Sequence, residues 1–525
     1  MLKKILLYGN TIRYLKHSQL YWQCIRKIYH PKIALHCPNI KTLGHAENWK
    51  TPIKNSHRIF QNDNIIFLNH AVALDNAIFK NLNNQSKLWQ YHFHYFNGLH
   101  SSCSETVLKT QNLLTQWVAK CPPYTKIAWD PYPISVRIGN IIKYHLNGGA
   151  LTQPILQSIY LQARYLFKIP EYHLLGNHLL ENAKALVFAG VFFQGDEPKK
   201  WLRLGMKILK QQIPEQILSD GGYFELSPMY HALMLELLLD LYNLFIAFEK
   251  SFPKTWFDRL QKMRFWLKVM THPDGHLSFF NDAALHIAPT LDVLEAYADR
   301  LALPPVSDIE NNCIYLKESG YLRLQNKNMV AILDCAKIGP DYQPAHAHAD
   351  TLSFELSIGQ KRCVVNSGTN VYAENLDQRT WQRSTASHST VEINQQSSSQ
   401  PWGVFRVAKR AYPKNLRIKK INNEWIVSCS HSGYNKAHTR IWKMNENYFT
   451  VEDIVKKNKP AIARYYFHPN FNDIDNKITV HHDGEKKITK SEYYPEFGKA
   501  IASNALTICF AESAIVQFEI SGSAS

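Results

Sequence analysis

The sequence predicts a helical N-terminal domain followed by an antiparallel β-sandwich. Before Pro304-Pro305, apolar residues recur every three or four positions, which is the spacing of helices with one buried face. After this junction, short apolar runs alternate with polar residues at a period of two, as in an antiparallel sandwich. A chain of 525 residues is too long for one hydrophobic core. We therefore predict a basic segment at 1–60, a helical domain at 61–305 and a β-domain at 306–525.

A large positive charge is concentrated at the N-terminal end. The chain has 60 Lys and Arg residues against 43 acidic ones, a formal net charge of +17, and residues 1–60 contain eleven basic residues but only one acid, Glu47. Such a charge favours an anionic partner, either nucleic acid, a membrane surface or an acidic polysaccharide. No nucleic-acid-binding motif accompanies it, so we expect no nucleic-acid partner. A hydrophobic content of 45% excludes a disordered chain.

Residues 2–30 combine basic charge with an amphipathic helical pattern. Two alternatives follow: contact of residues 1–30 with a membrane surface, or packing of a terminal helix on its own domain. The chain begins like a signal peptide, but the apolar run Ile5–Tyr8 is too short for one. The longest apolar stretch, Ala185–Phe193, is too short to span a bilayer, so we expect a water-soluble chain.

The predicted elements follow in order. About ten helices are expected between residues 60 and 300, and the clearest are the apolar periodic stretches at 179–190 and 234–245. The strands expected after the junction cover 320–324, 329–333, 351–356 and 425–429. The nine cysteines are scattered without a CxxC pair, so neither a disulfide framework nor a Cys-rich zinc site is expected.

Histidines precede two of the predicted strands. His346 and His348 are spaced by two, so in an extended chain their side chains share a face, which suits metal binding or acid–base chemistry. The alternative is a surface cluster. His388 directly precedes another strand, in a segment that also carries Arg379 and Arg383.

Two further polar motifs lead into apolar helices. His178 and Glu181 are three residues apart and share a helix face, with Asn177 just before them. An N-cap and a helix-surface pair is the alternative. Tyr230 follows a glycine-flanked loop, where a Tyr usually serves packing.

Together these motifs resemble the heparinase II/III-like polysaccharide lyases. The resemblance spans roughly residues 85–470 and rests on the following motifs in this order: Asn177-His178, Tyr230, His346-Ala-His348-Ala-Asp350, Asn366-Ser-Gly-Thr369 and His388-Ser-Thr-Val391. It implies an incomplete (α/α) toroid followed by a β-sandwich, and a lyase that cleaves a uronic-acid-containing acidic polysaccharide by β-elimination. It also implies a periplasmic or cell-envelope location in bacteria, with the cytoplasm as the alternative because no clear signal peptide is present.

The resemblance assigns roles to individual residues. Asn177 and His178 would neutralise the uronate carboxylate, since an amide and an imidazole can both donate hydrogen bonds to it. Tyr230 would transfer protons as the acid and, for one substrate epimer, also as the base. To act as a base, Tyr230 would need a pKa below its usual value, and neighbouring cations would provide this lowering. His346 would be a companion base or would tune Tyr230.

Further residues are expected to bind substrate or metal. We expect Glu181, Arg379 and Arg383 to contact the sugar; for the two arginines, a surface loop is the alternative. Relatives hold a divalent metal, often zinc, between a His, an Asp and a second His. The positions that match are the following: His348, Asn366 and His388.

Asn366 departs from the family pattern because a neutral amide is a poor zinc ligand. Three outcomes stay open: a metal-free hydrogen-bonded site, recruitment of Asp350, or a bound metal with a structural role. Asn366 also gives support to a rival function, an acidic-glycan-binding protein with a decayed site, although the other catalytic positions are intact.

A second rival is an epimerase or a glycoside hydrolase on a similar toroid. Epimerisation begins with the same C5 proton abstraction. Hydrolysis requires two paired acids, and nothing in the sequence pairs Glu181, Asp220 or Glu225.

Overall fold

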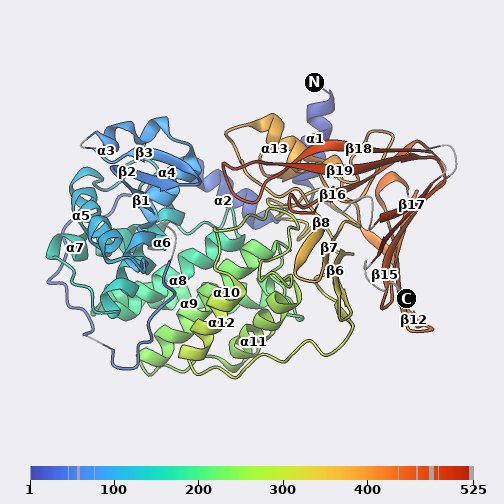
Figure 1. Ribbon diagram of the computed structural model, residues 1–525. Helices are drawn as coiled ribbons and strands as arrows, with labels where there is room; N and C mark the ends of the chain where they lie inside the picture. Colours follow the sequence, from blue (N-terminus) through green and yellow to red (C-terminus); the bar gives the residue numbers. More distant parts are fainter. Residues whose placement is uncertain are drawn as a thin grey trace.

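The computed structural model in Figure 1 shows a helical domain packed against a two-sheet β-domain, which confirms the predicted fold class. The structure describes residues 2–44, 46–55, 59–75, 77–435, 437–456, 459–471, 478–482 and 484–519. The last helix of the helical domain ends at Arg300 and the first strand of the β-domain begins at Cys313.

Two helices, α1 (Leu2–Ile12) and α2 (His17–Ile28), precede a small antiparallel sheet. This sheet consists of β1 (Phe60–Gln61), β2 (Asn64–Phe67) and β3 (His70–Ala73). The sequence did not predict it, because strands of two to four residues are too short to give a period-two signal.

The helical domain contains α3–α12. Their bounds are α3 (Ile78–Asn81), α4 (Lys87–Tyr95), α5 (Ser104–Lys120), α6 (Pro131–Leu146), α7 (Gln153–Lys168), α8 (Gly176–Phe192), α9 (Asp196–Gln216), α10 (Pro228–Ala247), α11 (Lys254–Val269) and α12 (Leu291–Arg300). Among the described residues, α10 alone is long and apolar enough to cross a membrane by length and composition. Because 72% of its most apolar window is buried, α10 has the character of a core helix.

The β-domain is built from two antiparallel sheets. The larger follows the order β18-β19-β16-β8-β7-β6-β5-β4 with β9 beside β16, and the smaller follows β12-β13-β14-β15-β20-β17. The larger sheet has β4 (Cys313–Leu316), β5 (Tyr321–Gln325), β6 (Met329–Asp334), β7 (Phe354–Ile358), β8 (Lys361–Val365), β9 (Val391–Ile393), β16 (Ala461–Phe467), β18 (Glu485–Tyr493) and β19 (Ile501–Phe510). The smaller has β12 (Pro413–Ile421), β13 (Glu424–His431), β14 (His438–Met444), β15 (Tyr448–Val455), β17 (Ile478–His482) and β20 (Ser513–Glu519).

Three of the four predicted strands are present as β5, β6 and β13. The strand predicted at 351–356 begins only at Phe354, because Leu352 has a φ of 64° and lies in a turn. His346 and His348, which precede this strand, therefore lie in a loop, and this loop extends to the boundary between the domains. Two short elements complete the β-domain: the helix α13 (Leu376–Gln382) and the hairpin of β10 (Pro401–Trp402) and β11 (Arg406–Val407).

The domains meet where the larger sheet packs on the segment between α11 and α12. One buried apolar cluster joins Trp266 and Phe280 from the helical side to Tyr321 and Ile332 from the sheet. The same segment continues to Asp282, which places a carboxylate at the centre of the boundary.

Candidate functional site

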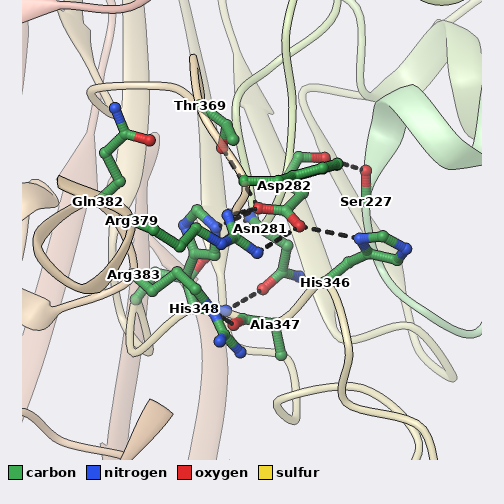
Figure 2. Close-up of polar contacts among 12 residues, drawn as sticks. Ser227, Asn281, Asp282, His346, Ala347, His348, Thr369, Arg379, Gln382 and Arg383 are labelled. Carbon is green, nitrogen blue, oxygen red and sulfur yellow. Dashed lines mark hydrogen bonds and ion pairs between the residues drawn. The ribbon is translucent and has the colours of Figure 1, made fainter. Parts of the chain in front are cut away.

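A buried carboxylate, Asp282, organises the candidate site (Figure 2). The Arg379 guanidinium donates to both of its oxygens, His346 Nδ1 lies 2.8 Å from Oδ2, and His348 Nε2 lies 2.8 Å from Oδ1. Its backbone carbonyl accepts a hydrogen bond from Ser227 Oγ at 2.5 Å. Burial opposes ionisation, but Arg379 and the two histidines outweigh it and hold the pKa of Asp282 well below its usual range.

Asp282 fixes the orientation of His346. Because Nδ1 donates to the carboxylate, the neutral ring carries its lone pair on Nε2. Nε2 lies 3.5 Å from Oε2 of the buried Glu225. The imidazole stacks on the ring of Tyr230 with centroids 3.8 Å apart and an interplanar angle of 27°. A carboxylate-oriented imidazole beside a phenol is suited to general acid–base catalysis.

Tyr230 lies in the first turn of α10. Ser227 caps this helix by accepting a hydrogen bond from the Tyr230 backbone N–H at 3.2 Å, and Pro228 follows at the first helical position. Tyr230 Oη is 3.0 Å from Tyr372 Oη. Burial, together with Tyr372 and the negative Asp282, raises the pKa of Tyr230 well above its usual value. This shift is opposite to the lowering that base work by Tyr230 would require, and it favours the neutral phenol.

Asn177 and His178 occupy the first turn of α8, which begins beside Glu225. The helix begins at Gly176, whose φ is +56°; a Cβ there would lie 2.5 Å from Glu225 Oε1, so only glycine fits. His178 Nδ1 is 3.1 Å from Oε2 of Glu171. Burial disfavours the charged ring, but Glu171 outweighs this and raises the pKa of His178 above its usual value.

Tyr132 lies beside the Asn177-His178 motif, with its ring centroid 4.4 Å from that of His178. Glu225 lies between this motif and His346, because its carboxylate faces Gly176 at the start of α8 and is 3.5 Å from His346 Nε2. Tyr230 stacks on the His346 ring.

Glu181 is placed differently from the prediction. It is 5% exposed, and its carboxylate pairs with Lys184 Nζ at 2.8 Å. Lys184 in turn lies 3.6 Å from Asp240, which pairs with Lys143 at 2.8 Å. We therefore correct the expectation that Glu181 contacts the sugar: it belongs to a buried ion-pair network between α6, α8 and α10.

Arg379 and Arg383 are both completely buried, which excludes the surface-loop alternative. Arg379 neutralises Asp282, and Arg383 donates to the carbonyls of Ala347 and Val404 at 3.0 Å each. The expectation of direct sugar contact is corrected accordingly. The two guanidiniums position the loops that carry His346 and Phe405.

The predicted metal site offers two imidazole donors. His348 Nδ1 and His388 Nε2 face each other at 3.0 Å. The Asn366 amide nitrogen donates to Phe279 O at 2.9 Å, and its oxygen accepts from Ser389 N at 3.1 Å. Asp350 Oδ2 accepts a hydrogen bond from Asn281 N at 3.2 Å.

No cluster of three or more His, Cys, Asp or Glu side chains that could hold a metal occurs in the described part of the chain. Two neutral nitrogens without an anionic third donor do not fit zinc, which prefers four donors in a closed structural site.

Substitution Asn366→Asp is expected to create the missing donor. We expect the dialysed wild-type protein to retain less than about 0.1 equivalents of zinc and the variant to bind about one. Without zinc the variant should melt lower, because a carboxylate would face the Phe279 carbonyl. Metal analysis and melting with and without zinc test this, with Asn370→Asp as a matched buried control. A full equivalent in the wild type would contradict the two-donor site.

Several residues of the site were not predicted: Asp282, Glu225, Tyr372, Tyr132 and Glu171. Asp282 ends the stretch Leu277-Ser278-Phe279-Phe280-Asn281, in which polar residues interrupt the apolar ones. No local sequence signal identifies it, because its side-chain partners lie far along the chain.

Comparison with known proteins agrees with this architecture. The family model described as Heparinase II/III N-terminus matches residues 54–303, and the model described as Heparinase II/III-like, C-terminal, matches residues 310–517. The chain is 28% identical over 317 residues to a heparin-sulfate lyase of Bacteroides stercoris, covering 56% of this chain and 46% of the relative. It is 26% identical over 362 residues to a heparin-sulfate lyase of Pedobacter heparinus, covering 62% and 52%.

The chain thus spans about half the length of the curated relatives it matches.

Solved structures share its fold. A crystal structure of heparinase III matches with a TM-score of 0.68 at 18% identity, covering 96% of this chain and 89% of the other. A heparan sulfate lyase from Pedobacter heparinus matches with a TM-score of 0.56 at 18% identity, covering 96% and 88%.

Proposed function

This chain belongs to the heparinase II/III family, and on that premise we propose that it is a polysaccharide lyase that cleaves a uronic-acid-containing acidic polysaccharide by β-elimination. The observation that carries the proposal is the imidazole of His346, oriented by Asp282 and stacked on the neutral phenol of Tyr230. The heparin-sulfate lyases among its relatives support an acidic glycan as the substrate class.

The reaction removes the C5 proton of a uronate and expels the oxygen on C4. A carbanion beside a carboxylate is costly, so the carboxylate must first be neutralised. Protonated His178 and the Asn177 amide are suited to this, because one supplies charge and both supply N–H donors.

Two proton transfers then complete the step. His346 Nε2 takes the C5 proton, the C5–H electron pair forms the C4=C5 double bond, and the C4–O bond breaks. Tyr230 Oη gives its proton to the departing oxygen, so that an unsaturated uronate and a free hydroxyl result. The close stacking of the two rings, with centroids 3.8 Å apart, supports their action on the same sugar unit.

A panel of uronic-acid polysaccharides tests the proposal. Heparan sulfate, chondroitin, hyaluronan and alginate are incubated with the protein while ultraviolet absorbance reports the unsaturated uronate. We expect the chromophore from at least one glycan. New reducing ends without it would indicate hydrolysis, C5 deuterium exchange without cleavage would indicate epimerisation, and binding alone would indicate a glycan-binding protein. Each of these three results would overturn the proposed lyase.

The proposed binding of the uronate carboxylate by Asn177 and His178 should make the reaction depend on pH. Glu171 raises the pKa of His178, so the ring is cationic below that pKa and loses its charge as the pH rises through it. We expect KM to rise by about tenfold above this pH, since one lost charge-assisted hydrogen bond is worth about 1.5 kcal/mol.

The substitution Glu171→Gln removes the carboxylate that raises the pKa of His178, so the rise in KM should occur at a lower pH. Initial rates measured over neutral and mildly alkaline pH test this shift. Glu197→Gln is the control, because Glu197 pairs with Arg164 through a bond of 2.7 Å away from the predicted site residues. Superimposable KM profiles for wild type and Glu171→Gln would contradict the assignment of His178.

A further inference from the structure

The N-terminal arm, defined here as residues 4–29, crosses from one domain to the other beside the candidate site. At its start, the Tyr8 ring packs on Trp402 of the β10–β11 hairpin with centroids 4.9 Å apart. Near its end, Trp22 stacks on Tyr172, which precedes α8, at 5.0 Å. Figure 1 shows α1 against the β-domain and α2 at the boundary between the domains. The arm precedes the part of the chain that the family model matches.

The arm contacts the loop that carries His346. Lys16 Nζ lies 3.9 Å from the centre of the Tyr342 ring, and Gln19 donates to the Tyr342 carbonyl at 3.3 Å. Lys16 also forms an ion pair with Glu215 of α9. Tyr342 precedes His346 by four residues on the same loop, so the arm is a neighbour of the catalytic centre and not a detached extension.

The arm also contacts the β10–β11 hairpin, which lies on the other side of His346. Trp402 donates its indole N–H to Thr11 Oγ1 at 3.0 Å. The tip of the hairpin carries Phe405, which is 42% exposed and whose ring centroid lies 5.9 Å from that of His346. A chain bound at His346 and leaving past Phe405 would therefore meet the arm next.

An arginine–aromatic patch lies at this point, formed by Tyr8, Trp402 and Arg406. The Arg406 guanidinium lies 4.8 Å from the centre of the Trp402 ring and 5.8 Å from that of Tyr8. Among the residues that the structure describes, Arg406 forms no ion pair with a carboxylate. Arg410, by contrast, is paired with Asp341 at 3.0 Å.

We propose that this arginine–aromatic patch binds an anionic sugar unit of the polysaccharide as the chain leaves the catalytic centre. A guanidinium can bind a carboxylate or sulfate through two parallel hydrogen bonds. Aromatic rings provide an amphipathic face that suits the apolar side of a sugar ring. The inference rests on the proposed function, because it extends the same substrate.

The rival occupant is an anionic membrane. Ile5, Leu6 and Ile12 of α1 are 59%, 57% and 46% exposed, as on a membrane-surface helix. The glycan is favoured because the patch lies on the same hairpin as Phe405, whose ring is 5.9 Å from that of His346. Binding to a membrane would not require the patch to lie close to the candidate site.

Binding measurements on a variant that is expected to cleave about a thousandfold more slowly test the proposal. In a Tyr230→Phe background, we compare R406Q with the control R417Q, which removes one exposed cation from β12. The probes are a long heparin oligosaccharide and a heparin disaccharide, measured by calorimetry. We expect Kd for the long probe to weaken about tenfold in R406Q only, with the disaccharide unaffected. Circular dichroism and melting exclude misfolding.

Three results would contradict glycan binding at the patch: no binding of the long probe by the Tyr230→Phe parent, equal Kd values in R406Q and R417Q, or loss of binding of R406Q to phosphatidylglycerol vesicles with its heparin affinity unchanged. The last would identify a membrane as the occupant. Cleavage assays keep this test apart from the proposed lyase activity. If the wild type cleaves a glycan but the patch variant binds heparin with an unchanged Kd, the proposed patch is wrong and the proposed lyase activity stands. If the patch variant has a weakened Kd but the wild type cleaves no glycan, the patch stands and the lyase activity is wrong.

Discussion

Replacing Tyr230 by Phe is expected to lower kcat by about a thousandfold while leaving the fold and KM nearly unchanged. The substitution removes only the hydroxyl that protonates the departing oxygen in the proposed mechanism. The remaining ring still fits against His346, whose centroid is 3.8 Å away. Tyr372 Oη loses a partner at 3.0 Å, which costs about 1 kcal/mol of stability. Initial rates on the cleaved glycan and a thermal melt provide the two measurements.

The matched control is Tyr321→Phe. Tyr321 is 1% exposed at the domain boundary and donates to the Leu226 carbonyl at 2.7 Å, so its substitution removes a buried hydroxyl of the same kind. We expect a similar small loss of stability and an unchanged kcat. A Tyr230→Phe enzyme with the kcat of the wild type would exclude Tyr230 as the acid.

Replacing Asp282 by Asn is expected to damage both catalysis and stability. The change leaves the buried Arg379 without its counter-charge, which costs about 3–5 kcal/mol. The new amide can also donate to His346 Nδ1, which moves the ring proton to Nε2 and removes the base. We expect kcat to fall by at least about a thousandfold, as for the loss of a general base. Urea unfolding and initial rates measure the two effects.

The chain contains a closely matched control in Asp453. This buried carboxylate binds Arg440 through two bonds of 2.7 and 2.8 Å and accepts from His438 at 2.8 Å, but it lies inside the β-sandwich. Asp453→Asn should lose similar stability and keep its kcat in the folded protein. If both variants lose kcat equally, Asp282 has a structural role only.

Both carboxylates should also contribute to acid unfolding. Each has its pKa depressed in the folded protein, by Arg379 for Asp282 and by Arg440 for Asp453, although burial acts in the opposite direction. Their stabilisation is therefore present above the pKa of an unfolded aspartate, about 4, and is lost as the pH falls below it.

Periodicity was sufficient to predict the fold class, because a buried helix face and a half-buried strand leave different spacings of apolar residues. It failed for β1–β3, whose strands are too short, and for the start of β7, where Leu352 adopts a left-handed conformation. Neither feature leaves a spacing that the sequence reveals.

The candidate site was predicted only as far as its motifs could be compared with a family. Asp282 has no local pattern, because the partners that define it lie 64 to 97 residues further along the chain. Arg379 and Arg383 were expected at a sugar or at the surface, since an arginine in a loop is usually solvated. Their complete burial depends on carbonyls and a carboxylate that only the tertiary fold brings to them.

The position of Asp282 has a mechanical consequence. It lies on the helical side of the boundary, whereas Arg379, His346 and His348 belong to the β-side, so the bonds that orient the base are the same bonds that hold the domains together. If the two domains moved apart in each catalytic cycle, the bonds from Asp282 that orient His346 would break each time. If the proposed function holds, we therefore expect an acidic glycan to enter along the boundary while the two domains stay in contact.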